Sequence, residues 1–111
     1  MTISEIAEAV GGKVAVDAPN AEASCAYAGD LLSDVMGHAG EGSVLITVQN
    51  HLNTIAVCTL VGIAVIVVCH DRPVSPDMAE AARRENVAIV TTSLSQYAAA
   101  IALRKLPPCE K

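Results

Sequence analysis

Large aromatic side chains are nearly missing from this sequence. Its 111 residues include no Trp, no Phe and two Tyr. Aromatic rings are the surfaces on which nucleic-acid bases and sugars stack, so their scarcity argues against a pocket that grips such rings. The core must instead consist of Val, Ile, Leu and Ala, and hydrophobic residues make up 52% of the chain. A chain of this length suits one compact domain.

Positive charge is also scarce. The sequence has 7 Lys and Arg against 12 Asp and Glu, which gives a formal net charge of −5 at pH 7. So few cations provide no basic face that neutralises a series of phosphates. The charge balance therefore argues against nucleic acid as a partner, and anionic membrane surfaces are disfavoured for the same reason.

No hydrophobic segment is long enough to cross a membrane. The longest candidate, residues 54–69, falls short of the roughly 18 to 20 apolar residues that a spanning helix needs, and Gly62 interrupts it. Its second half, IAVIVV, is rich in β-branched residues and is typical of a buried strand. We therefore expect this segment to lie in the core of the domain, and we expect no membrane partner.

Closely paired cysteines are absent as well. Cys25, Cys58, Cys69 and Cys109 are widely spaced, form no CxxC pair and follow no signal peptide. This spacing indicates reduced thiols in a cytoplasmic protein and no disulfide framework. We expect Cys25 and Cys58 to be small core residues and Cys109 to be an exposed thiol.

Strand and helix patterns alternate along the chain. We expect strands at residues 13–16, 24–29, 43–48, 63–69 and 87–92. We expect helices at residues 2–10, 51–62, 75–86 and 94–106, and a short helix and turn within 29–42. The marked helix starts are the capping-box pair Thr2 and Glu5, Ser75 ahead of Pro76, and the capping-box pair Ser93 and Gln96.

This alternation predicts the fold class. Strand-helix-strand units with near-continuous apolar strands are typical of a parallel sheet that is covered on both faces. The expected fold is a single α/β domain of three layers over residues 1–106, with a mostly parallel sheet of about five strands and helices on both faces. Residues 107–111 are expected to form a disordered tail.

Polar clusters follow three of the expected strands. In a parallel sheet, the carboxyl ends of the strands and the amino ends of the following helices share one edge, where unpaired N–H groups favour phosphate or carboxylate. We therefore expect a small anionic metabolite or nucleotide to bind there. The candidate residues are Gln49, Asn50, His51 and Asn53 after the first of these strands, His70, Asp71 and Arg72 after the second, and Thr92 and Ser93 after the third.

Capping is the alternative explanation for these side chains. Asn and similar residues commonly cap a helix, but one cap needs one such residue, and the polar groups of residues 49–53 exceed that demand. Asp30, Ser33 and Asp34 could form an acid pair for proton transfer or for a divalent cation, but a capped turn beside a short helix is the favoured interpretation. Asp30 and Ser33 are also candidate ligand-binding residues. Acids four residues apart repel each other unless a cation is near, and Arg72 is the candidate cation.

Metal binding and catalysis have weaker support. Cys69, His70 and His51 would be the metal ligands, but zinc sites use repeated short pairs such as CxxC or HxxxH, which this sequence lacks. A GxSxG elbow and a phosphate-cradling GxxxxGKS or GxxxxGKT loop are also missing. We therefore expect no metal, no cofactor and no enzymatic activity, and the alternative is a minor enzyme that depends on His51 or Asp30.

Residues 29–60 carry a family resemblance. The pieces GDLLSDVM and VQNHLN, the latter ahead of an AV-containing helix, resemble the DRTGG domain family, and the resemblance extends over nearly the whole chain. Members of that family are similar to the amino-terminal domain of HPr kinase and occur as regulatory modules in phosphotransacetylases and in inorganic pyrophosphatases with CBS domains. The resemblance implies an α/β fold, self-association as a homodimer and a regulatory role. The namesake pentapeptide is absent, and residues 71–73, Asp-Arg-Pro, are nearest to it.

These observations together predict a non-catalytic regulatory or ligand-sensing domain. A small anionic metabolite or nucleotide would bind at the strand ends and act through self-association or through a partner such as a metabolic enzyme. The alternative is a protein-interaction adaptor without a small ligand. A thermal-shift screen with a panel of metabolites separates the two, because an adaptor would not respond.

Overall fold

The molecule is built on a five-stranded, mostly parallel sheet. The computed structural model describes residues 1–109. The strands are β1 (Lys13–Val16), β2 (Cys25–Ala28), β3 (Ser43–Thr47), β4 (Val65–Val68) and β5 (Ala88–Thr91), in the spatial order β1-β5-β4-β3-β2. Strands β2 to β5 are parallel to one another, and β1 is antiparallel to β5. The prediction of a mostly parallel sheet is confirmed.

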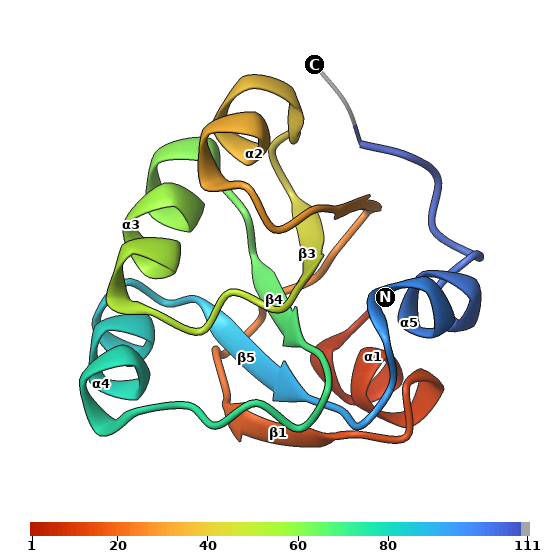
Figure 1. Cartoon of the computed structure of the whole chain (residues 1–111), viewed down its shortest axis with the longest axis horizontal. Helices are drawn as coiled ribbons and strands as arrows, with labels where there is room; N and C mark the ends of the chain where they lie inside the picture. Colours follow the sequence, from red (N-terminus) through yellow and green to blue (C-terminus); the bar gives the residue numbers. More distant parts are fainter. Residues whose placement is uncertain (110–111) are drawn as a thin grey trace.

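Helices cover both faces of this sheet. They are α1 (Ile3–Ala9), α2 (Leu32–His38), α3 (Leu52–Val61), α4 (Pro76–Arg84) and α5 (Gln96–Ala102). Figure 1 shows α2, α3 and α4 on one side of the sheet and α1 and α5 on the other, which confirms the expected three layers. Among residues 1–109, no helix is long and apolar enough to cross a membrane.

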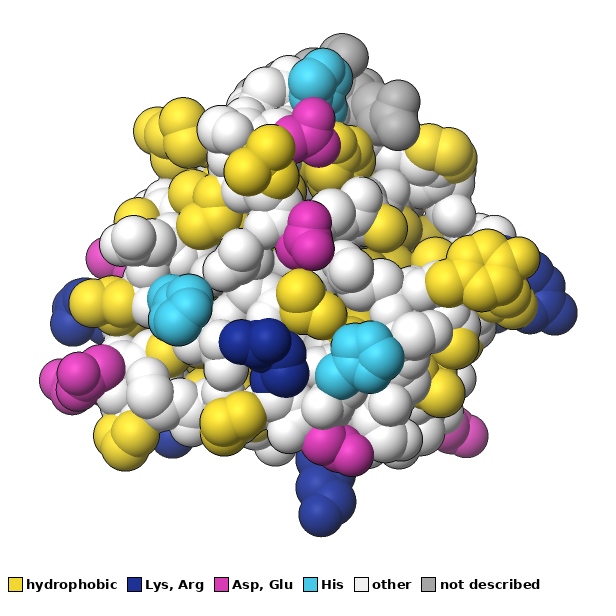
Figure 2. All heavy atoms as spheres, viewed as in Figure 1, with side chains coloured by type: hydrophobic (Ala, Val, Ile, Leu, Met, Phe, Trp, Pro, Cys, Tyr) yellow, Lys and Arg dark blue, Asp and Glu magenta, His cyan; other side chains and the backbone are white. Residues whose placement is uncertain are grey.

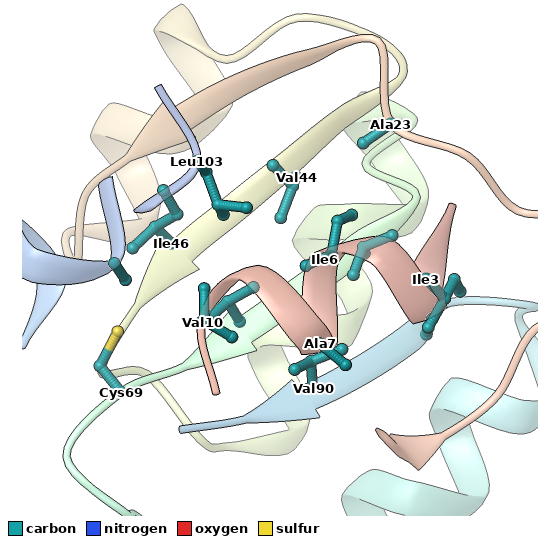
Figure 3. Close-up of a cluster of buried hydrophobic side chains, with 14 of the residues drawn as sticks. Ile3, Ile6, Ala7, Val10, Ala23, Val44, Ile46, Cys69, Val90 and Leu103 are labelled. Atoms are coloured by element: carbon teal, nitrogen blue, oxygen red, sulfur yellow. The ribbon is translucent and has the colours of Figure 1, made fainter. Parts of the chain in front are cut away.

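Each face of the sheet has its own apolar core. On one face, Ile6 of α1 clusters with Val44 and other strand residues (Figure 3). On the other face, Ile55 of α3 and Met78 of α4 cluster with Leu45. Alternate residues of each central strand point to opposite faces, so β3 and β4 are buried along their whole length. Each such aliphatic side chain stabilises the fold by about 1.5–3 kcal/mol through burial.

Two of the three marked helix starts have the predicted caps. The Thr2–Glu5 capping box is formed, and the Ser75 hydroxyl accepts a hydrogen bond from the Met78 N–H at 3.2 Å. At α5, the prediction is wrong. The N-cap is Ser95, whose hydroxyl accepts from the Ala98 N–H at 3.1 Å, so the expected capping box of Ser93 is not formed.

Two cysteines at opposite ends of the chain form a disulfide. Cys25 of β2 is bonded to Cys109, with the Cα atoms 4.8 Å apart. The prediction of four reduced thiols is therefore wrong for this pair. The two residues are separated by 84 positions in the sequence, so only the folded chain brings them together. Cys58 and Cys69 are free and buried, as was expected of Cys58.

The segment after α5 runs beside β2. The Ala26 N–H donates to the Pro107 carbonyl at 2.9 Å, and the Cys109 N–H donates to the Ala26 carbonyl at 3.1 Å. Residues 107–109 therefore cover the outer edge of an edge strand, which would otherwise expose unpaired backbone groups. Of the tail expected at 107–111, residues 110 and 111 lie outside the described residues.

Candidate functional site

The loops after β2, β3, β4 and β5 meet at one edge of the sheet. The parallel register places Thr47 of β3 beside Val68 of β4, and Val68 beside Thr91 of β5. The three polar clusters therefore leave the sheet side by side. We call this edge the rim, and it consists of residues 29–30, 48–53, 69–73 and 92–93. The rim loops cross the front of Figure 1, and Figure 2 shows histidine and basic side chains on that face.

Side-chain amides tie neighbouring loops of the rim together. Gln49 Nε2 donates to the Asp30 carbonyl at 2.6 Å, and Asn50 Nδ2 donates to the Pro73 carbonyl at 2.8 Å. Arg72 Nη2 in turn donates to Asn50 Oδ1 at 3.2 Å. Because Arg72 is exposed and forms no ion pair within residues 1–109, its charge is available to an anion.

The loop after β4 has an unusual backbone conformation. His70 and Asp71 have φ angles of 60° and 52°, in the left-handed region. This conformation costs an L-residue on the order of 1–2 kcal/mol. Hydrogen bonds from the His70 and Asp71 N–H groups to the Leu94 and Thr92 carbonyls, both 2.9 Å long, hold it in place. Both side chains are exposed at the rim.

Thr92 and Ser93 differ in accessibility. Thr92 is 2% exposed, and its hydroxyl donates to the Val10 carbonyl at 2.8 Å and accepts from the Leu94 N–H at 3.2 Å. That hydroxyl therefore holds the β5–α5 loop against the end of α1. Ser93 is exposed next to it and faces solvent.

Helices α3 and α4 both begin at the rim, but their starts differ. His51 is the N-cap residue of α3 and makes no capping hydrogen bond with its side chain to any described residue, whereas Ser75 caps α4. Capping therefore does not explain the polar cluster at α3. A cavity of about 500 Å³ lies between the two helix starts, and we call it the rim cavity. It is lined by Asn50, His51, Leu52, Pro73, Val74, Ser75, Pro76 and Asp77.

Asp30 and Ser33 do not cap the short helix α2. The N-cap residue is Leu31, and no side chain of the described residues bonds there, so the expected capped turn is wrong. The backbone carbonyl of Asp30 accepts the hydrogen bond from Gln49, and the Asp30 carboxylate is exposed at the rim. Ser33 is exposed within the first turn of α2.

Asp34 has partners other than the one we expected. Tyr27 donates its hydroxyl hydrogen to Asp34 Oδ2 at 2.5 Å, and His38 Nδ1 lies 3.1 Å from Asp34 Oδ1. Arg72 was the expected cation, but it bonds to Asn50 instead. The phenol and the imidazole thus hold this carboxylate on α2, away from the rim cavity.

The free cysteines are not available as metal ligands. Cys69 is completely buried, and burial raises the pKa of its thiol. Burial also raises the pKa of Cys58 to about 12. Within residues 1–109, no three His, Cys, Asp or Glu side chains are placed to hold a metal ion. The alternative of a metal site at Cys69, His70 and His51 therefore has no structural support.

A second cation, which we did not anticipate, lies beside the rim. Because β1 is antiparallel to β5, its first residue, Lys13, pairs with Thr91 at the carboxyl end of β5. Lys13 is exposed there. A Cβ on Gly12 would collide with the Thr91 carbonyl, so a glycine is needed where the chain enters β1. The sequence signal that could have indicated this position of Lys13 is the Gly-Gly-Lys segment at the entry to β1.

Comparisons with known proteins identify a similar structure. No protein-family model matches the sequence, and no curated protein matches it. Among solved structures, the chain is similar to the regulatory region of Clostridium perfringens pyrophosphatase, which contains CBS and DRTGG domains and is complexed with the activator diadenosine tetraphosphate. The TM-score is 0.72 at 13% sequence identity, over 96% of this chain and 47% of that one. The chain thus spans less than half of that structure and shares the fold of the part that it matches.

Proposed function

We propose that this chain, which has the fold of a DRTGG-like domain, is a non-catalytic regulatory domain that binds a small anionic metabolite or nucleotide at the rim. The observation that carries the proposal is the start of α3. There, a helix terminus without a side-chain cap opens onto a cavity, and Arg72 bonds to Asn50, which lines that cavity. The pyrophosphatase regulatory region, which binds a nucleotide activator, supports a ligand-sensing role.

The rim cavity suits a metabolite in both size and charge. About 500 Å³ is within the range of small-molecule sites. A phosphate group at the start of α3 gains from the backbone N–H groups of a first turn that no described side chain caps, from the helix dipole and from Arg72. The Asp77 carboxylate lines the α4 side of the cavity. The neutral part of the ligand therefore faces α4, and its anionic part faces α3.

Regulation would follow from a shift between conformations. Hydrogen bonds between Asn50, Arg72 and the Pro73 carbonyl link the loops that lead into α3 and α4. A ligand that bridges these loops stabilises one arrangement of the two helices and so changes their affinity for a second copy or for a partner enzyme. The expected homodimer and the candidate ligand residues Asp30, Ser33, Asn53, His70, Asp71 and Ser93 belong to this proposal.

Isothermal titration calorimetry tests the site with diadenosine tetraphosphate, ATP, AMP and inorganic phosphate as probes. We expect at least one of them to bind, and Arg72→Ala to weaken that binding by about tenfold or more, because a charge-assisted bond is lost. Arg83→Ala is the matched control, because Arg83 is exposed near the other end of α4. Absence of binding by every probe, or equal losses in both variants, would contradict the proposal.

A protein-interaction adaptor without a small ligand is the second candidate, because α3 exposes apolar side chains. Such an adaptor would show no thermal shift with any probe and would co-purify with a partner. A minor enzyme would show turnover that is lost in His51→Ala or Asp30→Asn. The proposal itself is independent of compartment: the cytoplasm was expected, whereas the Cys25–Cys109 disulfide is typical of oxidising surroundings.

A further inference from the structure

The outer side of α3 is apolar although it faces solvent. The helix sequence, LNTIAVCTLV, contains no charged residue. Its inner side is buried through Ile55 and Cys58, yet Leu52 and Leu60 on the outer side are 52% and 72% exposed. A helix that is hydrophobic all round is normally covered on all sides. In the described part of the chain, nothing covers this one.

A groove lies next to these leucines, between α3 and α4. Figure 1 shows the two helices side by side. The groove has a volume of about 410 Å³, and we call it the α3–α4 groove. It is lined by Leu52, Ile55, Ala56, Thr59, Leu60, Ala81, Arg84 and Glu85. A protruding apolar side chain, Leu60, and a hollow that accepts such a side chain therefore occur on one surface.

The charges beside the groove can complement those of a second copy. The whole chain has a net charge of −5, so two copies repel each other through most of their surfaces. The α3–α4 groove is locally neutral, because Arg84 and Glu85 lie next to each other with Nε and Oε1 3.9 Å apart. In a two-fold interface the same patch meets itself, so Arg84 of one copy can lie opposite Glu85 of the other, and Glu85 opposite Arg84.

We propose that the α3–α4 groove is the surface through which two copies of this chain associate. Leu60 of each protomer enters the partner's groove, and Arg84 of each lies opposite the partner's Glu85. The inference rests on the proposed function, because it names the surface for the self-association invoked there. Leu52 lines both the groove and the rim cavity, so a ligand at the start of α3 is adjacent to the interface.

Sedimentation velocity of the full chain over a range of concentrations tests this surface. We expect the wild type to dimerise and Leu60→Glu to raise the dissociation constant by at least about 30-fold, because a buried apolar contact becomes a buried charge. Leu31→Glu is the matched control, since Leu31 is 64% exposed and lies outside the groove. It should dimerise like the wild type. Circular dichroism should show that both variants remain folded, because the leucines are exposed.

Charge exchange tests the predicted pairing without altering the apolar contacts. Arg84→Glu makes the pair acidic in one protein, and Glu85→Arg makes it basic in another. Each variant alone should dimerise less than the wild type, because like charges then face each other. An equimolar mixture of the two should form heterodimers, because opposite charges are restored at both pairs.

The outcomes separate this inference from the proposed function. A dimer that Leu60→Glu leaves intact, or a mixture of charge variants that stays monomeric, would overturn the groove as the interface and leave self-association standing. A wild type that is monomeric at every concentration would overturn self-association itself. Ligand binding by the monomeric Leu60→Glu variant, measured by calorimetry with the probe that the wild type binds, reports on the rim independently of both results.

Discussion

Helices α3 and α4 lie side by side on one face of the sheet, but they are built differently. Helix α4 has the features of a helix that ends in water: a Ser75 cap, Pro76 at its first position, an early acid and two late arginines. Helix α3 has no side-chain cap among the described residues, no charged residue and two exposed leucines. Both helices bury an inner side against the sheet.

The difference shows where the described part of the chain leaves a helix without a cap and without apolar cover. At α4, the Ser75 hydroxyl caps the start of the helix, and charged residues occupy the side that faces solvent. At α3, no side chain among the described residues caps the first turn, and none of them covers the apolar outer side. The first deficit is what an anion at the rim would satisfy, and the second is what another copy of the chain would satisfy. The proposed site and the proposed interface thus lie on the same helix.

The largest effect should come from the inner side of α4. Met78 is completely buried, so Met78→Ala should lower the free energy of unfolding by about 2–5 kcal/mol. Leu60→Ala on the outer side of α3 is the control, and it should change the stability of the monomer by less than about 0.5 kcal/mol. Urea unfolding at low protein concentration measures both. Comparable losses in the two variants would mean that Leu60 is packed in the monomer.

The inner side of α3 should make stability depend on pH. Burial raises the pKa of Cys58 from 9.0 to about 12, so between these values the folded state keeps a proton that the unfolded state has lost. Stability should therefore be unaffected below pH 9 and then fall by about 1.4 kcal/mol per pH unit on this account. Cys58→Ala should lack this component. The free energy of unfolding of both proteins can be measured by urea unfolding between pH 8 and about 11. An equal loss of stability with rising pH in the two proteins would contradict the burial of this thiol.

The helix starts should respond in opposite directions. Ser75→Ala removes the cap of α4 and should cost about 1 kcal/mol. His51→Asp adds a carboxylate cap to α3 and should stabilise the protein by up to about 1 kcal/mol, while it weakens anion binding at the rim. Thermal denaturation measures the two changes in stability. Isothermal titration calorimetry, with the probe that the wild type binds, measures the change in anion binding. If His51→Asp bound the anion as tightly as the wild type, the ligand would not use the start of α3.

Much of the fold could be predicted from short-range patterns. The apolar runs of β3, β4 and β5 and the turn residues between them were enough to predict a parallel sheet, because its strands are buried on both faces. The parallel arrangement also predicts that Asn50, Arg72 and Ser93 lie at one edge of the sheet. Both inferences depend on residues close together in the sequence and on the handedness of strand-helix-strand units.

The features that escaped prediction depend on contacts between distant segments. The Cys25–Cys109 bond requires the segment after α5 to return to β2, which no local pattern indicates. Lys13 lies beside the rim because β1 is antiparallel to β5. At α5, the Thr92 hydroxyl is used by the Val10 carbonyl and the Leu94 N–H, which accompanies a helix start at Ser95 and not at Ser93.

The most direct test of the rim is a nitrogen-15 heteronuclear NMR titration of the full chain with diadenosine tetraphosphate or ATP. The account predicts that the largest shifts of backbone amide signals occur in residues 50–53 and 70–75, where the start of α3 and the loop into α4 line one cavity. Shifts concentrated at the opposite end of the sheet, or no shifts at millimolar ligand, would contradict it.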